Sequence, residues 1–250
     1  MTNPFDLFGK TAIVTGANTG IGQGIAIALA QAGADIVAVA RGDVAETEAK
    51  VRAAGRALLH VPADLSTTAP IADIVAQAAA RFGKIDILVN NAGTIRRADA
   101  LDFSEEDWDA VMGVNLKSAF FLSQAVARTM TGRGGKIINI ASMLSFQGGI
   151  RVASYTASKS GLAGITKLLA NEWAAKKINV NAIAPGYFET NNTEALRADE
   201  TRSRDILARI PAARWGTPGD LGGAAVFLAS GASDYVHGAI IPVDGGWLAR

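Results

Sequence analysis

The chain has 250 residues, of which 49% are hydrophobic, and a formal net charge of +1. A balance so near neutrality, without a cluster of Lys and Arg, argues against nucleic acid or an anionic membrane surface as a partner. The absence of cysteine excludes disulfides and thiolate chemistry, and two histidines are too few for a histidine-rich site, so we expect no metal.

The first residues, "MTNPFDLFGK", lack the basic flank and the apolar run of a signal peptide. No stretch approaches about 18 uninterrupted apolar residues, the length that a membrane span needs. We therefore expect a cytoplasmic protein without a membrane segment.

Short apolar segments alternate with longer amphipathic ones along the whole chain. The pattern predicts strands at 10–15, 35–40, 57–61, 86–90, 136–142, 178–185 and 238–246. It predicts helices at 20–33, 43–54, 67–82, 104–131, 154–175 and 218–229. Strands that are apolar throughout and separated by helices indicate a parallel sheet covered on both faces. The expected fold class is therefore α/β, a single Rossmann-type domain over 1–250 with a doubly wound parallel sheet.

The polar segment 186–217 interrupts this alternation. It is predicted to be an inserted helical lid or substrate loop, with a solvated surface excursion as the alternative.

A glycine-rich segment, "TGANTGIGQG" at 15–24, follows the first predicted strand and opens the first helix. Gly16, Gly20 and Gly22 would allow a tight turn whose N–H groups approach a pyrophosphate, beside the partly positive end of a helix. An ordinary turn can also be rich in glycine. The position at the first strand–helix crossover favours a dinucleotide site.

The end of the second predicted strand bears on the choice between NAD and NADP. An acid there would accept a bond from the ribose 2′-hydroxyl, whereas a base would favour a 2′-phosphate. Ala40 occupies this position and Arg41 follows, which argues for NADP. Arg41 could instead stack on adenine or point to solvent, and Asp43 lies nearby.

Two further strand ends hold candidate cofactor contacts. Asp64, in "PADL", could accept a bond from the adenine amino group or cap the next helix. "NNAG" at 90–93 offers small residues to a flat cofactor. Both lie at the carboxyl ends of strands, where ligands of such sheets bind.

Tyr155 and Lys159 lie one helical turn apart on the helix predicted to begin near Ser154. Alone, the pair could be two polar residues on an exposed face. Ser142 ends the fifth predicted strand, however, and Asn115 lies in the middle of a helix, where asparagine is otherwise unfavourable.

These residues, the glycine turn, "NNAG", "PG" at 185–186 and "VDGG" at 243–246 resemble, in order and spacing, the short-chain dehydrogenase/reductase family. The resemblance covers essentially the whole chain and implies an oxidoreductase that uses NAD or NADP. It implies these cofactor contacts: Gly16, Asn18, Thr19, Gly20, Ile21, Gly22, Arg41, Asp64, Leu65, Asn91, Ala92, Gly93, Tyr155, Lys159, Pro185, Gly186 and Thr190.

By the same resemblance, Tyr155 is the catalytic acid/base and Ser142 holds the substrate oxygen. Lys159 binds the nicotinamide ribose and lowers the pKa of Tyr155, and Asn115 anchors a water relay to Lys159. A lysine charge about 4 Å away, at an effective dielectric constant near 20, would lower a tyrosine pKa from about 10 by up to roughly 3 units. Proton transfer is most efficient near the working pH.

Longer stretches, among them "SMLSFQGGIRVASYTASKSG" and "NAIAPGYFETNNTEALRADETRS", resemble family members that act on keto-deoxy sugar acids. That resemblance implies a C6 sugar acid from pectin or uronate breakdown, a homotetramer, and a lean towards NAD that Arg41 opposes. A buried substrate carboxylate favours an arginine. We favour Arg97 and Arg151 over Arg96 and Arg214 because they neighbour the site elements.

Gln147 and Asn191 or Asn192 are the candidates for binding substrate hydroxyls. Gluconate, or a 3-oxoacyl group on an acyl carrier protein, is the alternative substrate, although the acidic run "DFSEEDWD" disfavours a carrier. A non-enzymatic cofactor sensor would have no need of the four catalytic residues.

Overall fold

The computed structural model describes residues 3–249. The predicted domain, 1–250, includes positions 1, 2 and 250, which lie outside the described residues. One parallel sheet forms its centre, in the order β3-β2-β1-β4-β5-β6-β7. The strands are β1 (Thr11–Thr15), β2 (Asp35–Ala40), β3 (Leu58–Pro62), β4 (Ile87–Asn90), β5 (Gly135–Ile140), β6 (Ile178–Pro185) and β7 (Ile240–Val243). The predicted doubly wound parallel sheet is confirmed.

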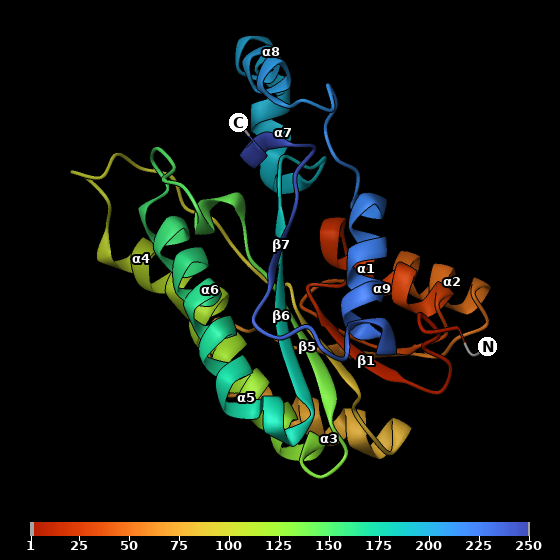
Figure 1. Cartoon of the computed structure of the whole chain (residues 1–250). Helices are drawn as coiled ribbons and strands as arrows, with labels where there is room; N and C mark the ends of the chain where they lie inside the picture. The colour runs from red at the N-terminus through yellow and green to blue at the C-terminus, as the bar shows by residue number, and fades with distance from the viewer. Residues whose placement is uncertain (1–2, 250) are drawn as a thin grey trace.

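Helices cover both faces of the sheet (Figure 1). One face packs against α1 (Gly20–Gln31), α2 (Ala45–Ala53) and α9 (Gly222–Ala229). The other packs against α3 (Ile71–Phe82), α5 (Ser118–Met130) and α6 (Ala153–Trp173). Successive strand residues point to opposite faces, so Val14 joins the first core and Ile13 the second. The two apolar layers hold the carboxyl ends of the strands at one edge.

The stretch predicted as one long helix at 104–131 is divided in three. α4 (Glu105–Met112) is capped by Ser104, whose side chain accepts a hydrogen bond from the Asp107 N–H, and α5 forms the last part. Between them, Gly113–Lys117 winds as a π-helix, a widened turn that holds Asn115. Such turns are frequent at functional sites, and this one supplies the reason for an asparagine inside a helix.

The helical segment Glu105–Met130 is long and apolar enough to cross a membrane by length and composition, with a mean hydropathy of 1.2. It also lies within the helical layer, where Leu122, Val126 and Met130 are buried against the sheet. We interpret it as a core helix.

The segment 186–217 lies beyond the carboxyl ends of the strands, where Figure 1 shows α7 (Glu194–Ala198) and α8 (Glu200–Arg209). Its helical nature agrees with the sequence, and its role as a lid stays a prediction. Every residue of α7 and α8 is at least partly exposed. These two helices therefore add little to the core, whereas Phe188, Ile210 and Trp215 of the same segment are buried. The segment borders the sheet edge where a ligand would bind.

Candidate active site

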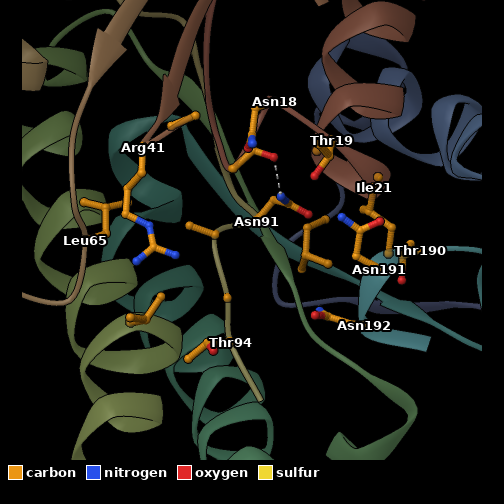
Figure 2. A pocket seen from close by; sticks show the side chains of 18 of the residues that line it. Asn18, Thr19, Ile21, Arg41, Leu65, Asn91, Thr94, Thr190, Asn191 and Asn192 are labelled. Carbon is orange, nitrogen blue, oxygen red and sulfur yellow. Dashed lines mark hydrogen bonds between the residues drawn. The ribbon is translucent and has the colours of Figure 1, made fainter. Parts of the chain in front are cut away.

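A cleft of about 620 Å³ opens at the carboxyl ends of the strands, within the range of ordinary ligand cavities. Every residue predicted to contact the cofactor lines it: Gly16, Asn18, Thr19, Gly20, Ile21, Gly22, Arg41, Asp64, Leu65, Asn91, Ala92, Gly93, Tyr155, Lys159, Pro185, Gly186 and Thr190. Figure 2 shows Arg41 and Leu65 on one side, Thr19, Ile21, Thr190 and Asn191 on the other, and Asn91 between them.

The glycine turn at the start of α1 has a backbone that side chains would disrupt. Gly16 has φ +67°, a left-handed conformation that favours glycine. A Cβ on Gly22 would lie 2.2 Å from the carbonyl oxygen of Gly16, so no other residue fits there without movement. The turn thus presents bare backbone to the cleft, as a pyrophosphate site requires.

Asn91 locks this turn to the end of β4. Its Nδ2 donates to the carbonyl oxygens of Thr15 and Gly16, at 2.9 and 3.3 Å. The Thr15 hydroxyl in turn accepts from the backbone N–H groups of Asn91 and Ala92, both at 2.9 Å. The first and fourth strands therefore present their ends to the cleft as one rigid unit.

The end of β2 carries a cation in place of an acid. Ala40 closes the strand, and the exposed Arg41 guanidinium lies 3.9 Å from the Asp64 carboxylate. A hydrogen bond from the Ser66 N–H, with a smaller contribution from Arg41, holds the pKa of Asp64 below its ordinary value. Asp43 accepts from the Ala45 N–H at the start of α2. Arg41 therefore places a positive charge on the lining of the cleft at the end of β2.

Tyr155 and Lys159 project from the first turns of α6 into the cleft. Lys159 is 4% exposed, and its ammonium donates to the carbonyl oxygen of Ile140 at 2.6 Å and lies 5.6 Å from the centre of the Tyr155 ring. Ser142 lies two residues beyond β5, which ends at Ile140, and its hydroxyl interacts with the Tyr155 phenol. These three side chains form the floor of the cleft.

Asn115 lies behind this floor and does not contact the cleft. Its Oδ1 accepts from the Thr94 N–H at 2.8 Å, and its Nδ2 donates to the Thr94 carbonyl at 3.0 Å and to the Ser158 hydroxyl at 3.2 Å. Ser158 donates to the carbonyl of Tyr155. Asn115 therefore connects the "NNAG" segment to the turn of α6 that holds Tyr155 and Lys159.

The pKa of Tyr155 departs from the sequence expectation. Burial raises the pKa above 10, and the Ser142 hydroxyl and the Arg97 charge counteract it only in part. Burial also lowers the pKa of Lys159 from its ordinary 10.5 to about 8, and its ammonium bonds to a carbonyl instead of the phenol. The expectation that Lys159 gives Tyr155 a lowered pKa is thus wrong for the chain alone, because burial disfavours the charged form of both groups.

The candidates for substrate binding separate into two groups. Asn191 lines the cleft. Arg97 is not itself a lining residue, but it donates to the carbonyl of the lining residue Asn192 at 3.2 Å and its charge reaches Tyr155. Gln147 and Arg151 are not among the lining residues of the described range 3–249, and Arg151 pairs with Asp99 at 3.3 Å.

Two other arginines are already paired with carboxylates. Arg96 lines the cleft but contacts Asp107 at 3.1 Å, and Arg214 holds both oxygens of Asp220 at 2.7 and 2.8 Å.

The cleft is also lined by residues that no sequence motif indicated, among them Ser66, Thr94, Phe188 and Thr193. Thr94 directly follows "NNAG" and Phe188 lies within "PGYFET", so proximity to a motif was the available signal.

Residues 16–248 match the family model described as enoyl-(acyl carrier protein) reductase. The chain belongs to the short-chain dehydrogenase/reductase family. Membership of this family agrees with the dinucleotide-type cleft and with Ser142, Tyr155 and Lys159 on its lining. The protein is therefore an oxidoreductase of a family that uses NAD or NADP.

Three relatives cover the chain almost completely. The 2-dehydro-3-deoxy-D-gluconate 5-dehydrogenase of Dickeya dadantii is 64% identical over 250 residues, which is 99% of each chain. A crystal structure from Agrobacterium tumefaciens with bound NADP is 60% identical, with a TM-score of 0.92 and 100% of each chain covered. A gluconate 5-dehydrogenase from Burkholderia cenocepacia, in complex with NADP and tartrate, is 43% identical, with a TM-score of 0.94, covering 99% of this chain and 98% of that one.

Proposed function

We propose that the protein reversibly oxidises the C5 hydroxyl of 2-dehydro-3-deoxy-D-gluconate to the 2,5-diketo acid, in pectin and uronate breakdown. The observation that carries the proposal is the convergence of Ser142, Tyr155 and Lys159 on the floor of a dinucleotide-type cleft. The 64% identity to a dehydrogenase of that name selects the substrate among sugar acids.

The nicotinamide ring, when bound, accepts or returns the hydride, and the protein orients and polarises the reacting groups. The Ser142 hydroxyl holds the substrate oxygen beside the phenol. Tyr155 exchanges the proton of that oxygen through its own phenol oxygen. Because burial keeps the pKa of Tyr155 above 10, the protonated phenol is ready to act as the acid when a ketone is reduced.

Oxidation of an alcohol requires Tyr155 to lose its proton. The charges of Lys159 and Arg97 favour the phenolate. In the proposed function, the Lys159 ammonium would also bind the ribose of the cofactor. Asn115 supports this arrangement by holding Thr94 and Ser158, and a water relay from Asn115 to Lys159 belongs to the same proposal.

We assign the substrate carboxylate to Arg97. Arg151, Arg96 and Arg214 each contact a carboxylate of the protein, whereas Arg97 donates to a backbone carbonyl and its charge already acts on Tyr155. A planar guanidinium suits two-point recognition of a carboxylate. Asn191 lines the cleft next to Asn192, the residue that Arg97 contacts, and we assign it to a substrate hydroxyl.

NADP is the cofactor that the site favours over NAD. Ala40 provides no acid for a 2′-hydroxyl, and Arg41 extends over the adenosine end of the cleft. Two relatives, at 60% and 43% identity, have NADP bound.

We also propose a cytoplasmic homotetramer. β7 is the last strand of the sheet, and its residues Ile240, Ile241 and Val243 are only half-buried. An apolar edge strand of this kind is usually covered in solution, and a second copy would cover it. Light scattering after size-exclusion chromatography measures the state directly.

The absorbance of the reduced nicotinamide tests the proposed reaction. Purified protein is mixed with 2-dehydro-3-deoxy-D-gluconate and NADP or NAD, and the Tyr155→Phe variant serves as control. Turnover with the sugar acid and not with D-gluconate supports the assignment, and the reverse result moves the protein to gluconate 5-dehydrogenase. A 3-oxoacyl carrier substrate is disfavoured because Asp107 already neutralises Arg96 at the cleft.

A further inference from the structure

Side chains from three parts of the chain hold the carbonyl groups of the glycine turn. Four consecutive carbonyl groups, those of Thr15, Gly16, Ala17 and Asn18, each accept a hydrogen bond from a side chain. Asn91 takes the first two. The other two belong to Thr47 on α2 and Gln23 on α1, which lie outside the lining of the cleft within the described residues.

Thr47 is completely buried, and its hydroxyl donates to the Ala17 carbonyl at 2.8 Å. Gln23 donates from Nε2 to the Asn18 carbonyl at 3.3 Å and to the Thr47 hydroxyl at 3.1 Å. The Thr47 hydroxyl thus both accepts and donates, so its geometry is fixed. A threonine on α2 and a glutamine on α1 therefore hold two adjacent peptide planes, one each.

Each bond also sets the direction of an N–H group, because N–H and C=O point in opposite directions across a planar trans peptide. The turn demonstrates this at Gly16: the Thr15 carbonyl faces Asn91 on the β4 side, and the Gly16 N–H bonds to the Val39 carbonyl on the β2 side. By the same rule, Thr47 and Gln23 direct the N–H groups of Asn18 and Thr19 away from the α1–α2 pair. Asn18 and Thr19 line the cleft.

We propose that Thr47 and Gln23 are positioning residues of the cofactor site, which act by holding two carbonyls back and two N–H groups towards a bound pyrophosphate. The inference rests on the proposed function, since it assumes a dinucleotide in this cleft. N–H groups that already point in the binding direction need not reorient when the anion binds, so the anion binds more tightly. Release of the Ala17 carbonyl would let that peptide plane turn and bring an oxygen towards the phosphate oxygens.

Fluorescence titration with NADPH tests the inference on the full chain. Thr47→Val keeps the shape of the side chain and removes the donor, and we expect the Kd of NADPH to rise about threefold to tenfold. The kcat at saturating NADPH should stay that of the wild type, and Thr47→Ser should restore the wild-type Kd. Thr129→Val is the matched control, because Thr129 also donates to a backbone carbonyl, in α5 and far from the cleft.

A wild-type Kd for Thr47→Val, or a weakened Thr47→Ser, would overturn the inference, since the hydroxyl would then have no role. An equal loss in Thr129→Val would assign the effect to general destabilisation. If Thr47→Val does not fold, the half-buried Gln23→Met takes its place with the same expectation. Failure of the wild type itself to bind NADPH and NADH would instead refute the proposed function.

Discussion

The buried Lys159 ammonium should lower the stability of the fold at neutral pH by a measurable amount. Burial brings its pKa from 10.5 to about 8, and at about 1.4 kcal/mol per pKa unit that gap amounts to about 3 kcal/mol. Below pH 8 the folded and unfolded chains both carry the proton, and the full cost is present. Between pH 8 and 10.5 the unfolded chain binds more protons, so the stability of the lysine protein rises with pH.

The test is Lys159→Met in a Tyr155→Phe background, which removes titration of the phenol. The variant should gain stability over its parent at pH 7, reduced by about 1 kcal/mol for the lost bond to Ile140. The difference in free energy of unfolding should shift by about 2–3 kcal/mol in favour of the lysine parent as pH rises from 7 to 10.

Urea unfolding at a fixed protein concentration, followed by tryptophan fluorescence, measures this difference at each pH. Lys167→Met, which removes an exposed lysine from the same helix, controls for the loss of a positive charge. A difference that does not change with pH, or that moves in favour of the methionine variant, would show that burial does not disfavour the charged form of Lys159.

Three further changes examine the rest of the site. Tyr155→Phe should abolish turnover by at least about a hundredfold and leave NADPH binding intact in a fluorescence titration, because general acid–base catalysis contributes about 10²–10⁴ in rate; retained turnover would remove the phenol from the mechanism. Gly22→Ala places a methyl group 2.2 Å from the Gly16 oxygen and should abolish binding of both nicotinamide cofactors, which the same titration detects. Arg41→Ala should lower kcat/KM for NADP about tenfold or more and leave that for NAD unchanged, by initial rates with each cofactor; an equal loss for both would mean that Arg41 does not read the 2′-phosphate.

The glycine turn, the strand ends and the tyrosine helix could be located from the sequence because each is a local pattern attached to a predicted element. Periodicity did not reveal that the helix holding Asn115 widens into a π-turn, since that depends on contacts with Thr94 and Ser158 made only in the folded chain. The pairing of Arg151 with Asp99 and the bond from Thr47 to Ala17 join residues 52 and 30 positions apart. No local pattern encodes such partners.

The pKa of Tyr155 shows a second limit of the same kind. A positive charge at a short distance predicts a lowered pKa for Tyr155, but the burial of Tyr155 and Lys159 has the larger effect and raises it. Burial follows from how the sheet and α6 pack together, so its effect on the pKa can be judged only from the folded chain.

The exposure of α7 and α8 has an evolutionary consequence. The groups proposed for acid–base chemistry lie beyond a strand end and on α6, which belong to the packed core, whereas α7 and α8, in the segment predicted to be a substrate loop, contain no buried residue. Substitutions there should therefore be nearly neutral for folding. Lineages could change this segment and acquire a new sugar acid while inheriting the hydride-transfer site unaltered, which is how one scaffold can diversify into many dehydrogenases.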